Sequence, residues 1–157
     1  LLAAVTIGRY FGVPSDRIDA ALEAYVPSNN RSQLEQTAHN HLIIDAYNAN
    51  PTSMAAALDN FRQMTVSPKM VILGAMKELG EYSAQEHRAV AEAVSADGFD
   101  RVWLVGEEFA DAVPPKARFF RTADEVIEAL KQEPLSGYYV LIKGSNSMKL
   151  ASVVPYL

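Results

Sequence analysis

Residues 45–51 carry the polar groups of this chain that are best suited to bind a ligand. They read DAYNANP and directly follow the apolar run LII, which predicts an acid and two amides at the end of a buried strand. The Asp45 carboxylate can accept hydrogen bonds from ribose hydroxyls, and the Asn48 and Asn50 amides can both donate and accept. A structural alternative stays open, because Asn50 followed by Pro51 is also a common way to cap and begin a helix.

A second polar cluster, residues 143–147, reads KGSNS and follows the apolar run YYVLI. Lys143 offers a cation at the end of a predicted strand, and Gly144 allows a tight turn. Ser145 and Asn146 add a hydroxyl and an amide, and the N-terminus of a following helix would favour an anion there. The cluster is not a P-loop, because the order G-x-x-x-x-G-K-[ST] is absent from the whole chain. The alternative is a capped turn with a solvated lysine.

The segment 73–80, LGAMKELG, ends a third apolar run and could form a wall of the same site. A purely structural interpretation competes with it, since Ser83 and Glu86 have the spacing of a capping box at the start of a helix. Ser15 or Asp16 is likewise expected to cap the second helix of the chain.

Four single residues carry less information. Arg31 follows a turn, and a lone arginine is usually a solvated surface group. His39 and His41 would share a strand face, but a metal site needs at least one more ligand, which the sequence does not indicate, so no metal site is predicted. Trp103 lies in the middle of an apolar run and is expected in the core. No Ser-His-Asp pattern points to a hydrolase.

Strands and helices alternate along most of the chain. Several strands are continuous apolar runs, which is typical of strands that are buried on both faces in a parallel sheet. The pattern predicts a Rossmann-like three-layer α/β/α domain with a mostly parallel sheet. The expected strands are 41–45, 69–74, 101–106, 116–120 and 138–143, and the expected helices are 53–62, 84–95, 123–131 and 147–153.

Two helices precede this pattern, over 1–11 and 15–24, and they have no strand on which to pack. The turn-rich segment VPSNN at 26–30 separates them from the rest. We therefore expect residues 1–26 to be the helical tail of a preceding domain and residues 27–157 to be the α/β domain. The chain starts without Met, as expected for a fragment of a longer protein.

Four predicted strands end in residues suited to ligand contact, namely Asp45, Gly74, Gly106 and Lys143. In a parallel sheet the carboxyl ends of the strands lie on one edge, which is the edge where open α/β sheets bind their ligands. The sequence therefore predicts a binding site built from several strand ends rather than from one motif.

The composition limits the partners of the chain. The formal net charge is −5 and no Lys/Arg cluster is long, so nucleic acid is not expected as a partner. No apolar run approaches the roughly 18 residues of a membrane span. Residues 1–5 lack the basic start and the cleavage site of a signal peptide. The absence of cysteine excludes disulfides, thiolate metal sites and cysteine nucleophiles.

Taken together, four segments resemble the Mur ligase family. The matching runs are NR at 30–31, IDAYNANPTSM at 44–54, LGAMKELG at 73–80 and VLIKGSNSM at 140–148, in the family's order and approximate spacing. The run YNANP is most similar to the members that add D-alanyl-D-alanine, and residues 1–25 are similar to the tail of the family's central ATPase domain. Two positions depart from the family, which commonly has Asp where Ala75 stands and Arg where Asn146 stands.

The resemblance implies the C-terminal domain of an ATP-dependent ligase that adds D-alanyl-D-alanine to UDP-N-acetylmuramoyl-tripeptide through an acyl phosphate. Such an enzyme acts in peptidoglycan precursor synthesis in the bacterial cytoplasm, and so in cell-wall formation, cell shape and cell division. ATP and Mg²⁺ would be its cofactors, with Mg²⁺ held mainly by the central domain. The N-terminal and central domains would be the partners of this chain, which is expected to be inactive alone.

The resemblance also assigns roles to residues. On the nucleotide side it implies Arg31, Asp45, Asn48 and Asn50, with Asp45 toward the ribose. On the side of the dipeptide or the reacting phosphate it implies Lys143, Ser145 and Asn146. No catalytic residue is expected in this chain. The alternative, without the family, is a stand-alone Rossmann-like module that binds a nucleotide or a metabolite and catalyses nothing.

Overall fold

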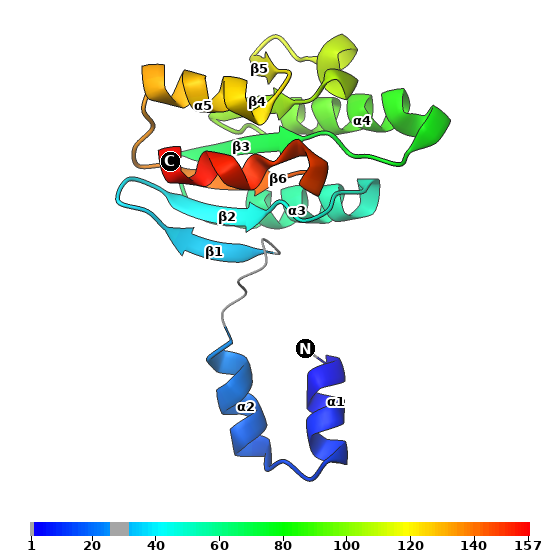
Figure 1. The fold of residues 1–157 in the computed structure, drawn as a ribbon, viewed down its shortest axis with the longest axis vertical. Coiled ribbons are helices and arrows are strands. Elements are labelled where there is room, and N and C mark those ends of the chain that lie inside the picture. Colours follow the sequence, from blue (N-terminus) through cyan, green and yellow to red (C-terminus); the bar gives the residue numbers. More distant parts are fainter. Residues whose placement is uncertain (1, 26–31) are drawn as a thin grey trace.

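The computed structural model describes residues 2–25 and 32–157 of the chain (Figure 1). Two helices come first, as predicted, α1 (Leu2–Tyr10) and α2 (Ser15–Glu23), and they contact each other. The predicted turn at 26–30 and the candidate ligand residue Arg31 lie outside the described residues. The elements from residue 33 onward form an α/β domain around a six-stranded sheet.

The sheet has the strand order β1-β2-β6-β3-β4-β5, so the last strand of the chain lies in its middle. All neighbouring strands are parallel except β1, which pairs antiparallel with β2. The mostly parallel sheet predicted from the apolar runs is therefore confirmed. The strands are β1 (Gln33–Gln36), β2 (His41–Asp45), β3 (Lys69–Gly74), β4 (Arg101–Val105), β5 (Ala117–Phe120) and β6 (Tyr139–Lys143).

Helices cover both faces of the sheet and give the three predicted layers (Figure 1). Side chains alternate between the faces along each strand, so Met70 and Ile72 belong to one core and Val71 and Leu73 to the other. The first core is closed by α5 (Ala123–Gln132) and the 3₁₀ segment η4 (Leu150–Tyr156), and the second by α3 (Pro51–Gln63), α4 (Ser83–Ala96) and η2 (Glu107–Ala112). Trp103 is 1% exposed in the first core, as predicted.

The edge strand β1 is the one strand of the described sheet that the sequence did not predict. Its four residues, QLEQ, are mostly polar and alternate between half-buried and exposed. Leu34 is 71% exposed, so an apolar residue in this run points to solvent and the pattern of an amphipathic strand is lost. The strand forms because it completes the hydrogen bonds of β2 at the edge of the sheet.

The predicted final helix over 147–153 is wrong. Two 3₁₀ segments stand there, η3 (Asn146–Met148) and η4, separated by Lys149. Lys149 has a left-handed backbone with φ of 54°, which an α-helix cannot contain. Leu150 and Val153 are both fully buried, and their spacing of three matches the period of a 3₁₀ helix. The final segment therefore still buries apolar side chains against the sheet, but as a 3₁₀ helix.

The start of α3 confirms the structural interpretation of Asn50. Its side-chain oxygen accepts a hydrogen bond from the Ser53 N–H at 2.8 Å, and the Ser53 hydroxyl oxygen accepts from the Asn50 N–H at 3.1 Å. Pro51 is the first helical residue, where a missing N–H has no cost. These hydrogen bonds fix the backbone conformation at Asn50, near the end of the polar run that follows β2.

The other two predicted caps are wrong. No side-chain cap bond from Ser83 begins α4, because the 3₁₀ turn η1 (Gly80–Tyr82) leads directly into that helix and makes Tyr82 the capping position. The backbone N–H of Ser83 instead donates to the Gly80 carbonyl. At α2 the capping position is Pro14, and its carbonyl accepts from the N–H groups of Arg17 and Ile18 at 3.1 Å each.

His87 of α4 is fully buried and fixes the loop that follows β3. Its Nε2 accepts a hydrogen bond from the Met76 N–H at 3.0 Å, so the ring proton must sit on Nδ1. Nδ1–H then donates to the Ser83 carbonyl at 2.7 Å. The ring also packs edge-on against Phe109 with centroids 4.7 Å apart. The imidazole therefore joins the loop 74–80, α4 and η2.

Replacement of His87 by Ala is expected to lower the free energy of unfolding by about 2–4 kcal/mol, since it removes a buried ring and leaves the Met76 N–H without its acceptor. Chemical denaturation measures the change. Arg88→Ala, at the exposed neighbouring position, is the control and should change stability by less than about 0.5 kcal/mol. Equal stability of the two variants would show that His87 has no such joining role.

Candidate functional site

The four predicted strand ends meet at one edge of the sheet, as expected. Asp45 at the end of β2 lies level with Lys143 at the end of β6, and Lys143 lies level with Leu73 of β3. Gly74 in turn lies level with Val105 of β4. The ends of β2, β6, β3 and β4 are therefore consecutive along this edge, which we call the carboxyl edge.

An ion pair between Asp45 and Lys143 stands at the centre of the carboxyl edge. Lys143 Nζ donates to Asp45 Oδ2 at 2.5 Å, and the two side chains are 1% and 20% exposed. Nζ also lies 3.4 Å from the Asn48 carbonyl oxygen. The alternative of a solvated lysine, which the sequence left open, is therefore wrong. The Lys143 ammonium group is inside the protein, and its partners are the end of β2 and the loop that follows.

A second donor orients the Asp45 carboxylate. Asp45 Oδ1 accepts from the Ser32 backbone N–H at 3.2 Å. Within the part of the chain that the structure describes, each carboxylate oxygen thus has one donor, while a carboxylate offers about four acceptor positions in total. Because the side chain is 20% exposed, Asp45 keeps acceptor positions that a ligand can reach.

The amides of Asn48 and Asn50 both make local backbone contacts. Asn48 Oδ1 accepts from the Ala49 N–H at 2.9 Å, and the Asn50 oxygen belongs to the cap of α3. Both residues are exposed. A ligand that contacts either residue has to share the amide oxygen or use the NH₂ group.

The turn after β6 places Ser145 and Asn146 beside the end of β3. Ser145 is 8% exposed, and its Oγ lies 3.2 Å from the Ser147 Oγ. The Ser145 N–H donates to the Ala75 carbonyl at 3.3 Å. Asn146 is exposed and begins η3. These residues lie at the same edge as Asp45, as predicted.

Close approach of two strand ends explains the glycines at this edge. A Cβ built on Gly144 would lie 2.9 Å from the Gly74 Cα and 3.1 Å from the Gly74 N. Backbone atoms cannot move aside as a flexible side chain can, so a larger residue at position 144 would force β6 and β3 apart. The turns after β6 and β3 therefore approach each other more closely than a side chain at position 144 would allow.

The ion pair of Lys77 with Glu108 is a feature of this edge that the sequence did not reveal. Lys77 follows β3 and Glu108 lies in η2 after β4, so only the adjacency of these strands brings them together. Burial raises the pKa of Glu108, but the hydrogen bonds from Lys77 and from its own backbone outweigh it and lower the pKa overall. Ala75, where the family commonly has Asp, is fully buried beside Gly106.

Unusual backbone angles also gather at the carboxyl edge. Among the described residues three non-glycine residues have positive φ, namely Ser32 at 47°, Glu78 at 65° and Lys149 at 54°. Ser32 donates to Asp45, and the other two lie in the segments that follow β3 and β6. Such conformations are costly for residues with a Cβ and are typical of functional loops.

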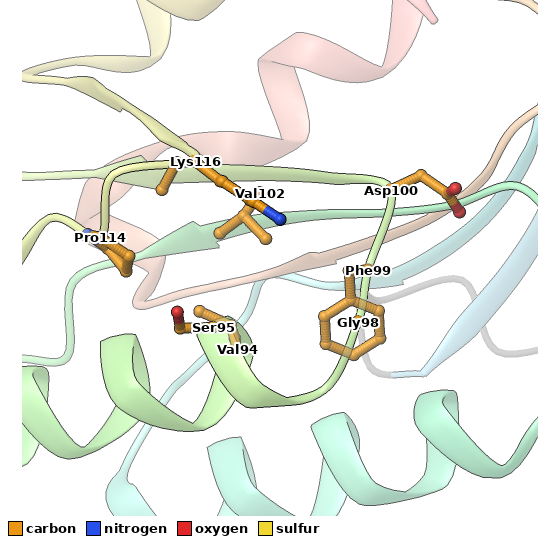
Figure 2. A pocket seen from close by; sticks show the side chains of 9 residues that line it. Val94, Ser95, Gly98, Phe99, Asp100, Val102, Pro114 and Lys116 are labelled. Carbon is orange, nitrogen blue, oxygen red and sulfur yellow. The ribbon is translucent and has the colours of Figure 1, made fainter.

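A pocket of about 240 Å³ lies at the opposite edge of the sheet (Figure 2). It is formed by the end of α4, the residues that lead into β4 and the start of β5, with Val94, Phe99 and Val102 among its apolar side chains. Asp100 also lines this pocket, and its carboxylate accepts a hydrogen bond from the Lys69 backbone N–H at 2.7 Å, at the start of β3. The pocket is therefore separate from the carboxyl edge.

The described residues do not provide a metal site by themselves. Within 2–25 and 32–157 no group of three His, Asp or Glu side chains could hold a metal ion. The same part of the chain has no helix long and apolar enough to cross a membrane.

A family model for the Mur ligase glutamate ligase domain matches residues 30–146, which includes the whole carboxyl edge. The chain belongs to the Mur ligase family. Its relatives include the UDP-N-acetylmuramoyl-tripeptide–D-alanyl-D-alanine ligases of Treponema pallidum and Bacillus subtilis. They are 34% and 32% identical over 99% and 98% of this chain. The chain spans only 36% of the length of each.

Solved structures of Mur ligases have the same fold. MurF from Acinetobacter baumannii superimposes with a TM-score of 0.75 at 30% identity, over 98% of this chain and 35% of that one. MurF from Thermotoga maritima, solved in complex with ADP, gives a TM-score of 0.78 over 97% and 35% of the two chains, at 22% identity. The Rossmann-like fold of this Mur ligase chain is therefore confirmed.

Proposed function

We propose that this chain is the C-terminal part of an ATP-dependent ligase that joins D-alanyl-D-alanine to UDP-N-acetylmuramoyl-tripeptide. The observation that carries the proposal is the 34% identity, over 99% of the chain, to a ligase of that name. No comparison favours the alternative of a stand-alone binding module. The product would belong to peptidoglycan precursor synthesis, and the enzyme would act in the bacterial cytoplasm, where ATP is available.

The proposed enzyme has two further domains before this chain. Residues 1–26 would be the helical tail of the central domain, and residues 27–157 the C-terminal domain. The separate packing of α1 with α2 supports this division. The central domain would carry the P-loop, which this chain lacks, and the ligands of Mg²⁺, for which the described residues offer no cluster.

The reaction forms an amide at the expense of ATP. A carboxylate oxygen of the tripeptide attacks the γ-phosphorus, ADP leaves, and an acyl phosphate forms. The uncharged amine of D-alanyl-D-alanine then attacks the acyl carbon, loses its extra proton, and expels phosphate. Little covalent chemistry falls to the protein, so catalysis rests on positioning and charge stabilisation.

The carboxyl edge would supply part of that positioning. On the nucleotide side, Asp45 would accept hydrogen bonds from the ribose hydroxyls. Arg31, Asn48 and Asn50 would also belong to the ATP-binding side. The support is the orientation of Asp45 by two protein donors and its partial exposure. Ser145 and Asn146, in the turn beside the end of β3, would lie toward the dipeptide or the reacting phosphate.

Ligation by the full-length protein tests the proposed function. With ATP, Mg²⁺, UDP-N-acetylmuramoyl-tripeptide and D-alanyl-D-alanine, we expect phosphate release and a pentapeptide product, identified by its mass, in equal amounts. Omission of any one substrate should stop both signals. L-Alanyl-L-alanine and D-glutamate serve as control amines. Faster ligation of either control, or phosphate release without the dipeptide, would contradict the proposal.

A further inference from the structure

We propose that Lys143 is a positioning residue, whose buried ammonium group fixes the Asp45 carboxylate for the ribose of the nucleotide and does not itself contact the dipeptide or the reacting phosphate. The inference rests on the proposed function, because it assigns the role of one residue within that site. It differs from the role that the family resemblance implied for Lys143.

The position of Lys143 in the sheet explains its burial. β6 lies between β2 and β3 in the middle of the sheet, and Lys143 is its last residue. Its side chain points to the same face as that of Leu141, two residues earlier, which belongs to the core beneath α3. Only 1% of the side chain is exposed. The charge therefore lies inside the domain, where a cation is stable only with acceptors around it.

Within the described residues, the ammonium group has two acceptors, and both belong to the side of the site proposed to bind the nucleotide. They are the Asp45 carboxylate at 2.5 Å and the Asn48 carbonyl oxygen at 3.4 Å. Asn48 lies in the loop after β2, so one ammonium group joins the end of β6 to both the end of β2 and this loop. No buried side-chain nitrogen or oxygen of the described residues lacks a partner.

This arrangement prepares Asp45 before any ligand arrives. Lys143 holds Oδ2, and the Ser32 N–H at 3.2 Å holds Oδ1. Two donors on different oxygens fix both the position and the rotation of the carboxylate plane. A carboxylate that is already oriented loses less conformational freedom when it binds hydroxyl groups, so it binds them more tightly.

A direct contact of Lys143 with phosphate would dismantle the same arrangement. The ammonium group has a third N–H, but a side chain that is 1% exposed can offer it to a ligand only if Nζ moves outward, away from the Asp45 oxygen at 2.5 Å. The Asp45 carboxylate would then lose its strongest donor at the moment when it has to hold the ribose. The two roles therefore compete, and the geometry favours the positioning role.

A double-mutant cycle in the full-length ligase tests the inference through KM for ATP. The variants are Lys143→Met, which keeps the length of the side chain without its charge, Asp45→Asn, and both together. We expect Lys143→Met alone to raise KM for ATP about tenfold, with kcat and KM for the dipeptide within about twofold of the original values. In the Asp45→Asn protein, Lys143→Met should add less than about twofold to KM for ATP.

A nucleotide without ribose hydroxyls separates a positioning role of Lys143 from a purely structural role, because only the positioning role acts through those hydroxyls. With 2′,3′-dideoxy-ATP as substrate, the Lys143→Met variant and the unchanged enzyme should have the same KM. Lys143→Arg, which keeps the charge, should raise KM for ATP less than Lys143→Met does, and it remains informative if the Met variant fails to fold. Lys116→Met, at an exposed position at the amino end of β5, is the matched control.

Three results would overturn the inference. They are a large fall in kcat with KM for ATP unchanged, a rise in KM for the dipeptide, and multiplicative effects in the double mutant. The first two would place Lys143 at the reacting groups, and the third would show that its effect does not act through Asp45. Failure of the proposed function looks different, since the unchanged full-length enzyme would then produce no pentapeptide at all.

Discussion

Replacement of Asp45 by Ala in the full-length ligase is expected to raise KM for ATP about 10- to 100-fold. The reason is the loss of the proposed charged acceptor for the ribose hydroxyls, since a hydrogen bond to a charged group contributes about 1.5–3 kcal/mol. The carboxylate is oriented by Lys143 and Ser32 and is partly exposed at the carboxyl edge. Steady-state kinetics with ATP varied at saturating tripeptide and dipeptide measures the change.

The same substitution is expected to destabilise the fold. It leaves the Lys143 ammonium group, 1% exposed, without its charged partner, which costs about 3–5 kcal/mol in buried pairs. Adding Lys143→Met to Asp45→Ala should recover much of that stability, because no buried charge is then left unpaired. It should not recover KM for ATP, because the acceptor is still missing.

This pair of measurements separates ligand binding from folding. Asp59→Ala is the control, since Asp59 is an exposed carboxylate on α3 that pairs with Arg62, and it should leave KM for ATP unchanged. An unchanged KM in the Asp45→Ala variant would remove Asp45 from the nucleotide site. Recovery of KM together with stability in the double variant would mean that Asp45 is only a structural residue.

The isolated chain of 157 residues is expected to form no detectable pentapeptide, at least about 1,000-fold less than the full-length ligase per molecule. Its sequence has no P-loop, and its described residues have no cluster of metal ligands. In the proposed division of labour, the groups that stabilise charge on the transferring phosphate belong to the central domain, and the carboxyl edge supplies only positioning. Product formation followed by mass, with the two proteins at equal concentration, measures the difference.

Loss of activity in the isolated chain has to be distinguished from loss of folding. Circular dichroism of the isolated chain, compared with the helix and strand content described above, provides that control. A folded chain that forms pentapeptide by itself would contradict the division of labour between the domains. It would place catalytic groups in this chain that the carboxyl edge does not explain.

The sequence predicted those features that depend on neighbouring residues. Apolar runs predicted five of the six strands, since strands buried on both faces have no polar alternation. The cap at Asn50 and the gathering of Asp45, Gly74 and Lys143 at one edge followed from local patterns and from the direction of parallel strands. Each of these predictions needed only a short window of the chain.

Contacts between distant residues could not be predicted in this way. Asp45 and Lys143 are 98 positions apart, and they meet only because β6 inserts between β2 and β3. The strand order is set by the packing of the whole domain, so the sequence could not exclude the alternative of a solvated lysine at position 143. The joining role of His87 depends in the same way on the loop after β3 folding back onto α4.

Hydrogen–deuterium exchange of the full-length protein tests most directly whether the carboxyl edge is the nucleotide-facing wall of the ligase. With a non-hydrolysable ATP analogue at saturation, we predict slower exchange in peptides that cover 45–50 and 143–148. Peptides over 94–102, at the pocket on the opposite edge, should be unchanged. Unchanged exchange at 45–50 with the analogue bound, or protection confined to 94–102, would contradict this account.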